Sequence, residues 1–203
     1  YHNCPGHFGH VICSKPFFQP FFITHVYKLV QQSCWNCFQP CTHSMCERCG
    51  RRQGKWHRDG TFKDHFFHRV GRVKKELTTD EIMCILQNQD RVNSPKQPAA
   101  WLLTTVLPIM PPVSRPSTLH KGKWSHHSLT NSYGTFIKEN SVLLAFIQQH
   151  QPAHIIQTQW RRTQDQLYKI YDVRDGSDKT YNEGIRQRLD GKAGRFRKNM
   201  MGT

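Results

Sequence analysis

The spacing of apolar residues predicts four helices, over residues 20–32, 78–89, 129–150 and 152–172. In three of them the apolar positions recur three or four residues apart, which places them on one helical face. The second helix begins with Thr78 and Glu81, a capping-box pair that satisfies backbone N–H groups at a helix start. The faces expected to be buried are Phe22, Val26 and Leu29 in the first helix, Ile82, Ile85 and Leu86 in the second, and Ile156, Trp160, Leu167 and Tyr171 in the last.

The segments between these helices are predicted to be extended or irregular. Residues 34–60 are cysteine-rich and loop-like, and the basic, aromatic stretch that follows, to about Lys75, alternates weakly in a way typical of strands. Residues 90–100 and 117–128 are polar and predict a linker and a loop. Prolines exclude a helix after Trp101 and favour an extended, partly polyproline path; they are Pro108, Pro111, Pro112 and Pro116. The fold class expected is mixed α+β.

Two C-x-x-C pairs separated by a short loop stand out, Cys34 with Cys37 and Cys46 with Cys49. A two-residue gap lets both thiolates of a pair turn onto one ion, and four thiolates complete a tetrahedral site. Because four protein ligands leave no position for a catalytic water, the pattern predicts structural Zn²⁺. Two disulfides are the alternative, but a reducing compartment is favoured by three cysteines without obvious partners, Cys13, Cys41 and Cys84.

Cys4-Pro-Gly-His7 has the spacing of half a second zinc site. No further C-x-x-C pair remains in the sequence to complete it. A surface cysteine and histidine near a turn are an equally good interpretation of these two residues. If the chain is a piece of a longer protein, the other half of this site is expected to precede Tyr1.

The composition and the motifs limit which partners and which reactions are expected for this chain. The chain has 203 residues, and its 29 lysines and arginines outnumber 14 aspartates and glutamates, giving a net charge of +15. Such a charge indicates a polyanionic partner, with nucleic acid first and an anionic membrane surface second. No apolar run approaches the roughly 20 residues of a membrane span. No pattern of a serine hydrolase, a metalloprotease or a nucleobase deaminase is present.

The C-terminal residues 185–203 hold six basic residues against one acidic residue, Asp190. Gly191 and Gly194 let backbone N–H groups approach phosphates. The run predicts phosphate contacts without base readout, and a solvated basic surface is the alternative. The residues spaced closely enough to follow one backbone strand are Lys192, Arg195 and Arg197.

Several blocks occur in a fixed order: CPGHFGHV (4–11), the two C-x-x-C pairs ending in CGRRQ (34–53), TVLPIMPPVSRPS (105–117), SLT, Y and IKEN (128–140), PAHIIQ (152–157) and IRQRLDGKAGRFRKNMMG (185–202). Together they resemble the N-terminal part of the largest subunit of multisubunit DNA-dependent RNA polymerases. The likeness is greatest to the eukaryotic nuclear enzymes and to those of large DNA viruses. It spans nearly the whole chain and implies a fragment of that subunit.

The resemblance implies a zinc-containing clamp head, a helical clamp core and long loops. It divides the chain into an N-terminal zinc-binding part of the clamp core (1–75), part of the clamp head with a return segment (76–114), the lid, helical core and short rudder (115–184), and the start of a switch region (185–203). It implies that Cys34, Cys37, Cys46 and Cys49 bind the clamp zinc and that Cys4 and His7 belong to a second zinc site. The nucleic-acid contacts that it implies are Arg188, Lys192, Arg195 and Arg197.

This sequence departs from the family pattern at three places. Asp190 stands where the family usually has lysine, and Lys198 where it usually has glycine. The segment at the rudder position, about 173–184, is short and lacks the usual S-G-R-P approach to the switch. These departures are typical of a divergent member, such as a viral one.

The resemblance also implies the reaction. The full enzyme is a nucleotidyltransferase that transcribes DNA into RNA, and its Mg²⁺-binding aspartates (N-A-D-F-D-G-D) are not in this chain, which alone should not polymerise. Implied partners are template DNA, the RNA–DNA hybrid, the second-largest subunit and smaller subunits, with no membrane. Implied locations are the nucleus, or a virion or infected-cell cytoplasm. A free-standing zinc-ribbon protein that binds nucleic acid is the alternative.

Overall fold

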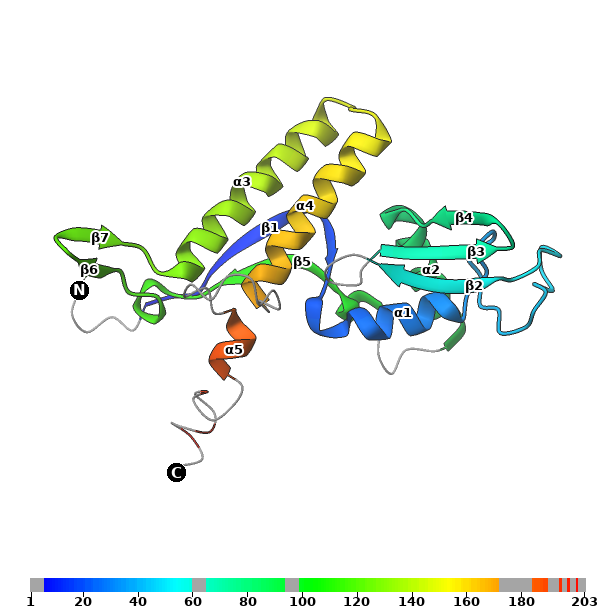
Figure 1. Ribbon diagram of the computed structural model, residues 1–203, viewed down its shortest axis with the longest axis horizontal. Coiled ribbons are helices and arrows are strands. Elements are labelled where there is room, and N and C mark those ends of the chain that lie inside the picture. Colours follow the sequence, from blue (N-terminus) through cyan, green and yellow to red (C-terminus); the bar gives the residue numbers. More distant parts are fainter. Residues whose placement is uncertain are drawn as a thin grey trace. The chain divides into compact units, whose positions relative to one another are not determined.

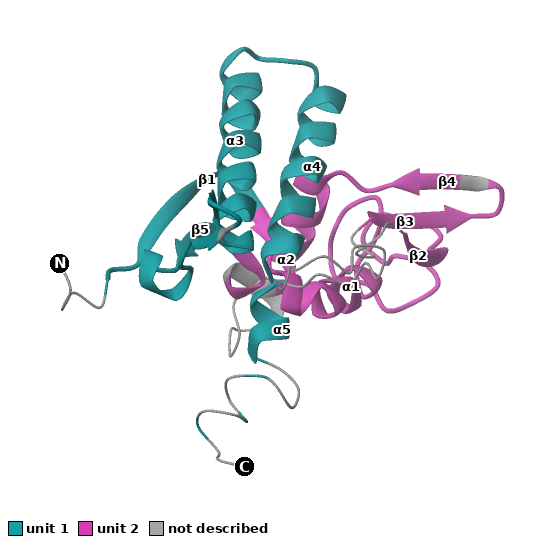
Figure 2. Ribbon diagram, turned by 60° about the vertical axis from the view of Figure 1, so that its left-hand side comes forward, with its two compact units in different colours: residues 1–16, 105–203 teal, residues 17–104 magenta. Residues whose placement is uncertain are grey.

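A computed structural model describes residues 6–59, 65–93, 99–171, 184–189, 194, 197 and 200. Helices and strands are mixed along the chain (Figure 1), which confirms the α+β class. The chain forms two compact units, residues 1–16 with 105–203 (unit 1) and residues 17–104 (unit 2), coloured separately in Figure 2. The four segments expected from the resemblance were defined by the functional parts of the family and not by compactness. Their assignment stays a prediction.

The strands are β1 (Gly9–Phe18), β2 (Lys55–Asp59), β3 (His65–Val70), β4 (Val73–Glu76), β5 (Leu103–Ile109), β6 (Thr118–His120) and β7 (Lys123–Ser125). The helices are α1 (Ile23–Gln31), α2 (Thr79–Asn93), α3 (Ser128–Gln148), α4 (Ala153–Tyr171) and the short α5 (Ile185–Leu189). Three 3₁₀ turns, η1 (Pro20–Phe22), η2 (Ala99–Leu102) and η3 (Pro112–Ser114), complete the described elements. All four predicted helices are therefore present. The predicted extended path after Trp101 is present as β5, although η3 interrupts it.

Helix α1 buries Val26 as expected, but its other buried residues are not the predicted ones. Ile23, Val26 and Val30 are the buried residues, whereas Phe22 is 46% exposed. Phe22 belongs to the 3₁₀ turn η1, whose tighter winding ends before the helix proper begins. The apolar residues of this segment fit two neighbouring helical stripes, so periodicity alone did not distinguish them.

Helix α2 begins as its capping box predicts. The Glu81 amide donates to Thr78 Oγ1 at 3.3 Å, and the Thr78 amide donates to Glu81 Oε2 at 2.8 Å. The predicted face of Ile82, Ile85 and Leu86 is buried. The helix continues to Asn93. The expectation of a linker from residue 90 was therefore wrong, because a polar sequence can extend a helix whose first turns are already packed.

Strands β2, β3 and β4 form an antiparallel sheet in unit 2, in that order. The weak alternation before Lys75 is confirmed as strand structure, and β2 lies within the stretch that was expected to be a loop. Along β2 and β3, exposed and buried positions alternate, with Phe66 and His68 buried against the rest of the unit. One face of the sheet thus packs inward and the other faces solvent.

Strand β1 was not predicted, and it pairs with β5 about 90 positions later in the chain. In unit 1, its residue Ser14 is bound by Asn140 of α3, which is 7% exposed. The Ser14 amide and hydroxyl lie 2.9 and 3.0 Å from Asn140 Oδ1, and Asn140 Nδ2 donates to the Ile12 carbonyl at 3.1 Å. One buried amide side chain therefore fixes β1 on the helical hairpin.

Helices α3 and α4 pack side by side in unit 1 (Figure 1). The stripe predicted for α4 is largely confirmed, because Trp160, Leu167 and Tyr171 are buried and Ile156 is half-buried. The Trp160 indole donates to the Pro16 carbonyl at 3.1 Å. Neither helix meets the length and hydropathy of a membrane span, and no other helix among the described residues does.

Residues 117–128 are not only a loop. Strands β6 and β7 form a two-stranded hairpin whose turn, Lys121-Gly122, has positive φ at both residues. This geometry is typical of a tight type I′ hairpin turn, and glycine at its second position is well suited to it. The prediction of a plain loop was wrong because each strand has only three residues, too few to show an alternating pattern.

Candidate metal centre

The four paired cysteines lie on two turns with the same backbone design. In the first turn the Phe38 amide donates to the Cys34 carbonyl at 3.0 Å, and in the second the Gly50 amide donates to the Cys46 carbonyl at 2.8 Å. Phe38 and Gly50 have φ of 57° and 65°. The chain reverses at both places through one left-handed residue, which brings the sulfurs of each C-x-x-C pair together.

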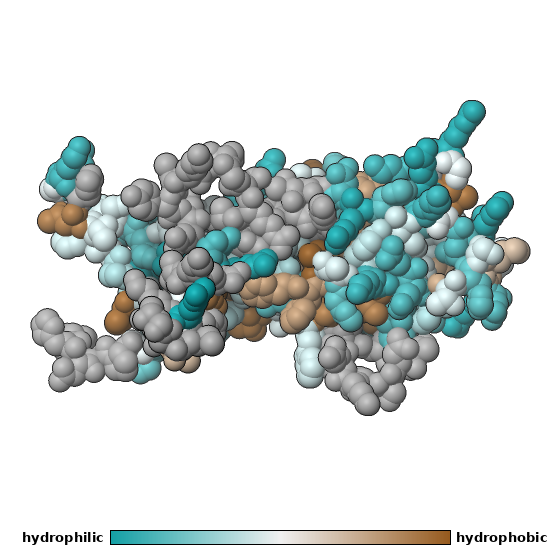
Figure 3. Space-filling view, turned by 60° about the horizontal axis from the view of Figure 1, so that its bottom comes forward, coloured by the Kyte–Doolittle hydropathy of each residue, from teal (hydrophilic) through white to brown (hydrophobic). Residues whose placement is uncertain are grey.

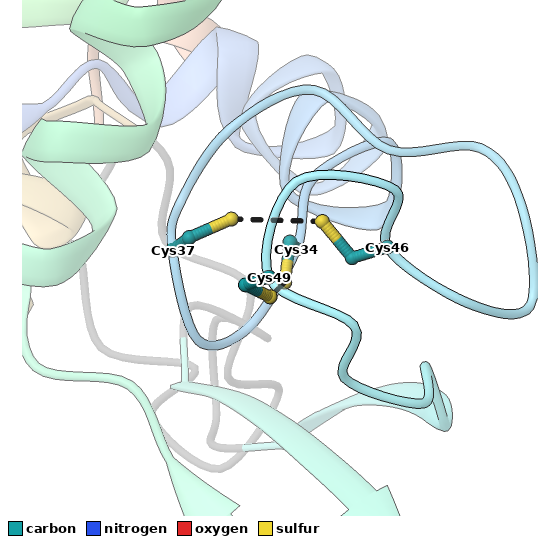
Figure 4. Close-up of side chains that lie close together, drawn as sticks. All are labelled: Cys34, Cys37, Cys46 and Cys49. Atoms are coloured by element: carbon teal, nitrogen blue, oxygen red, sulfur yellow. Dashed lines mark hydrogen bonds between the residues drawn. The ribbon is translucent and has the colours of Figure 1, made fainter.

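The four sulfurs form one cluster (Figure 4). The Cys34 and Cys49 sulfurs are 3.6 Å apart, as are those of Cys37 and Cys46, and all four lie within 4.8 Å of one another. A tetrahedral zinc site with Zn–S bonds of about 2.3 Å has sulfurs roughly 3.8 Å apart. The observed spacing therefore fits one ion and is too long for disulfide bonds of about 2.05 Å.

The ionisation of the four thiols favours the binding of a cation between them. Backbone N–H donation from Cys49, aided by Arg48, lowers the pKa of the Cys46 thiol to about 6. Burial, together with the neighbouring thiols, raises the pKa of Cys37 to about 12. Because four sulfurs this close cannot all ionise unaided, a divalent cation is the natural compensation for the remaining thiolates.

Amide donors surround the Cys34 sulfur. The Gln53 side chain donates to this sulfur at 3.2 Å, and the Asn36 backbone amide approaches it at 3.4 Å. Such N–H···S contacts stabilise a thiolate and orient it for a metal. Gln53 lies within the CGRRQ block, but the cysteine spacing by itself gave no reason to assign it this role.

Helix α2 holds the first cysteine turn in place. Asn88 Nδ2 donates to the Phe38 carbonyl at 3.1 Å. Gln89 Nε2 donates to Ser33 Oγ at 2.8 Å and to the Gln32 carbonyl at 3.2 Å, which satisfies acceptors where α1 ends. Both amides are buried. The site is thus anchored by two polar residues that lie three and four positions after Ile85, on the buried side of α2, although their polarity alone would suggest exposure to solvent.

His68 of β3 supports the other side of the centre. Its ring stacks on Trp35 with centroids 5.3 Å apart, and its Nε2 accepts a hydrogen bond from the Gly54 amide at 2.9 Å. A Cβ at Gly54 would lie 2.0 Å from the Arg69 carbonyl oxygen, so only glycine fits this approach. His68 is therefore neutral, and burial, together with Lys75, lowers its pKa.

The neutral state of His68 predicts an acid-sensitive fold. With its pKa lowered in the folded state, the unfolded chain binds a proton first, so stability is lost as pH falls below about 6.5. We expect the urea midpoint to drop between pH 7.5 and 5.5, and to drop less in His68→Gln, which keeps an acceptor for the Gly54 amide. Equal pH dependence in the two proteins would contradict this assignment.

The structure describes only some of the other predicted site residues. Cys4, Lys192 and Arg195 lie outside it, and His7 is exposed. The cysteine quartet is the only group of three or more clustered metal-binding side chains among the described residues. The half-site of Cys4 and His7 therefore stays a prediction.

The two described arginines of the tail differ in their surroundings. Arg188 lies on α5, and its guanidinium approaches Ser128 Oγ, at the start of α3, at 3.4 Å. Arg197 is exposed. The structure therefore places Arg188 near the base of the helical hairpin, and the predicted contacts with nucleic acid stay predictions.

Comparison with known proteins agrees with this architecture. Residues 39–200 match the sequence model of the family described as RNA polymerase Rpb1, domain 1. The subunit Rpo1N of the DNA-directed RNA polymerase of Methanococcus vannielii is 29% identical across 98% of this chain, and that of Sulfolobus acidocaldarius is 25% identical across 98%. The beta' subunit of Ehrlichia chaffeensis is 31% identical over 64% of the chain.

The match covers only a part of each relative. The chain spans 28% of the length of the two archaeal subunits and 10% of the bacterial one. The alignment with the Methanococcus subunit extends over 252 positions, more than the 203 residues of this chain, so that relative has additional residues within the aligned region. The family match over residues 39–200 includes the second cysteine pair, both long helices and the basic tail. The chain therefore belongs to the Rpb1 domain 1 family, the N-terminal part of the largest RNA polymerase subunit.

Proposed function

We propose that this chain is the clamp region of the largest subunit of a DNA-dependent RNA polymerase, and that the complete enzyme transcribes DNA into RNA. The family match over residues 39–200 is the observation that supports this most strongly. The Mg²⁺-binding aspartates of the active site belong to another part of the subunit. The role of this segment is then mechanical and electrostatic.

Zinc is the metal that the centre fits best. Cys34, Cys37, Cys46 and Cys49 would hold it, and four thiolates leave no open position for chemistry on a substrate. When bound, the ion cross-links loops that contain no helix or strand between residues 34 and 54. This part of the chain, which buries few apolar side chains, gains a rigid shape from it.

The β6–β7 hairpin corresponds to the lid of the family. Its exposed Leu119 and Trp124 are cross-strand partners, and Trp124 is 71% exposed. Arg115 fixes the hairpin base by donating to the Met110 carbonyl at 2.9 Å and to Thr130 Oγ1 at 3.0 Å. An aromatic side chain held on such a support is suited to stack on a base and keep RNA apart from the template strand.

The tail is proposed to hold the template backbone. Arg188, Lys192, Arg195 and Arg197 follow one another with glycines between them, which suits phosphate contacts and not base readout. Closure of the clamp over DNA and the RNA–DNA hybrid would bring this segment to the template. The second-largest and smaller subunits are the expected protein partners. A nucleus, or a virion or infected-cell cytoplasm, is the expected location.

The function is tested on the complete reading frame. We expect the full-length subunit, copurified with its partners, to incorporate labelled nucleotides into RNA only when template DNA is present. The frame should continue beyond residue 203 into an N-A-D-F-D-G-D block. A frame with natural ends near Tyr1 and Thr203 and no template-dependent synthesis would instead indicate a free-standing zinc-ribbon protein.

A single substitution tests the tail. Arg195→Ala should lower the affinity of the assembled enzyme for template DNA and reduce the slope of log K against log salt by about one unit, because one phosphate contact is lost. Arg162→Ala removes an exposed arginine on α4 and is the matched control. The tail assignment fails if both variants keep the affinity and salt slope of the parent.

A further inference from the structure

The solvent face of the β2–β3–β4 sheet carries three basic residues in one row. The strand register places Lys55 opposite Arg69 and Arg69 opposite Lys74, so the three side chains lie on neighbouring strands and on the same face. All three are exposed. We call them the cation row. Adjacent strands are about 4.8 Å apart, so the row extends over roughly 10 Å.

The inward face of the sheet fixes the direction of the row. Phe66 and His68 alternate with the row positions along β3 and are 0% and 2% exposed. A shift of the register by one residue would bury the charges and expose these rings, at a large cost. The row is therefore held outward by the packing of the opposite face.

Nothing within the described part of the chain neutralises the row by an ion pair. Lys75, by contrast, points to the other face and pairs with Glu81 at 2.7 Å. Two acidic residues lie on the same face as the row, but neither is opposite a row residue. Asp59 pairs with His65 and Glu76 with Phe67, and the Glu76 carboxylate lies 3.4 Å from His65 Nδ1. Like charges directly opposite each other destabilise a sheet. An anionic ligand would relieve this repulsion.

Aromatic side chains adjoin the cations. The Lys74 ammonium lies 3.8 Å from the centre of the Phe67 ring, and Phe67 pairs with His57, two positions along the register from the Lys55–Arg69 pair and on the same face. Exposed Arg72 in the β3–β4 turn adds a fourth positive charge near the same end. Figure 3 shows that the visible face of unit 2 is largely hydrophilic. Cations arranged beside rings are typical of surfaces that bind nucleic-acid strands, whereas an acidic peptide needs only the charges.

We propose that the cation row binds the phosphate backbone of nucleic acid. Arg69 already donates Nε to the Gly71 carbonyl at 3.1 Å, which orients its guanidinium and leaves two terminal nitrogens for phosphate oxygens. Lys55 and Lys74 flank it as point charges. The row belongs to unit 2 and shares no residue with the tail of the proposed function, so the proposal does not depend on the tail.

The test compares two triple variants of the full chain that lose the same charge. Lys55→Gln, Arg69→Gln and Lys74→Gln together remove the row, and Lys138→Gln, Arg162→Gln and Lys169→Gln remove three exposed cations of α3 and α4. Anisotropy of a labelled 20-nucleotide single strand and of the matching duplex is measured from 50 to 200 mM salt. Thermal melting verifies that each variant folds. If the row variant does not fold, Lys55→Gln with Lys74→Gln keeps Arg69 and its bond to Gly71.

The row variant should bind at least about tenfold more weakly at 50 mM salt and lose roughly two to three units of salt slope, since three phosphate contacts disappear. The control should change little by comparison. Weaker binding of the row variant to the single strand, to the duplex or to both supports the proposal, and the affected probe identifies the form of nucleic acid that the row binds. Equal binding by the two variants overturns it. The proposal is also overturned if the row variant loses binding to labelled poly-glutamate but keeps binding to DNA, because the partner would then be an acidic protein.

Discussion

Cys46→Ser is expected to abolish metal binding by the chain, from one zinc ion per molecule to none. Cys46 is 3% exposed and supplies one of four sulfurs that lie within 4.8 Å of one another. Three remaining thiolates leave an open position and a weaker site. Structural zinc contributes about 10 kcal/mol or more to the folding of isolated zinc-finger peptides, so its loss should be severe.

Three measurements check this expectation. Zinc content by atomic emission should fall from one to zero per chain, the thermal midpoint should fall by about 10 °C or more, and protease cleavage should appear within residues 34–54. Cys41→Ser is the matched control, because the Cys41 sulfur lies outside the quartet, 3.6 Å from the His43 carbonyl oxygen. Full zinc in Cys46→Ser, or loss of zinc in Cys41→Ser, would contradict the assignment.

The same preparation distinguishes zinc from disulfides. The chain has eight cysteines, so denaturation with a chelator but without reductant should expose eight reactive thiols. Two disulfides would leave four. The 3.6 Å separation of the closest sulfurs supports the first result.

Asn140→Ala is expected to destabilise unit 1 by about 3 kcal/mol. The substitution removes the buried amide that bonds Ser14 and the Ile12 carbonyl, and it leaves those groups of β1 without their partner. Each buried polar group deprived of its hydrogen bond costs about 1–3 kcal/mol. Loss of β1 from α3 should follow, since the contact joins residues 126 positions apart.

Urea unfolding and amide exchange measure this effect. The free energy of unfolding should fall, and the amides of Ser14 and its neighbours should lose protection first. Asn131→Ala, an exposed position on the same helix, should stay within about 0.5 kcal/mol of the parent. An equal effect of the two substitutions would mean that helix propensity, and not the bond to β1, determines the stability.

Features encoded over a few residues could be predicted from the sequence. The capping box of Thr78 and Glu81 and the buried face that follows are confirmed, because both depend on residues three or four positions apart. The cysteine quartet follows from the spacing of two C-x-x-C pairs. In these cases local geometry and chemistry leave few alternatives.

Other features needed the tertiary structure because they join distant residues. Strand β1 acquires its structure from β5 and Asn140, neither of which is near it in sequence. The support of the metal centre by Asn88, Gln89 and His68 depends on how α2 and β3 pack on the cysteine turns.

The basic surface of the sheet illustrates the same division. In the sequence, residues 69–75 are a run of positive charge with no evident direction. The register of three strands places Lys55, Arg69 and Lys74 together on one face and sends Lys75 to the other. The sequence by itself determined the family, the cysteine quartet and the helical segments, since these rest on local spacing. Strand pairing determined which charges meet, because residues far apart in the chain become neighbours only when the sheet forms.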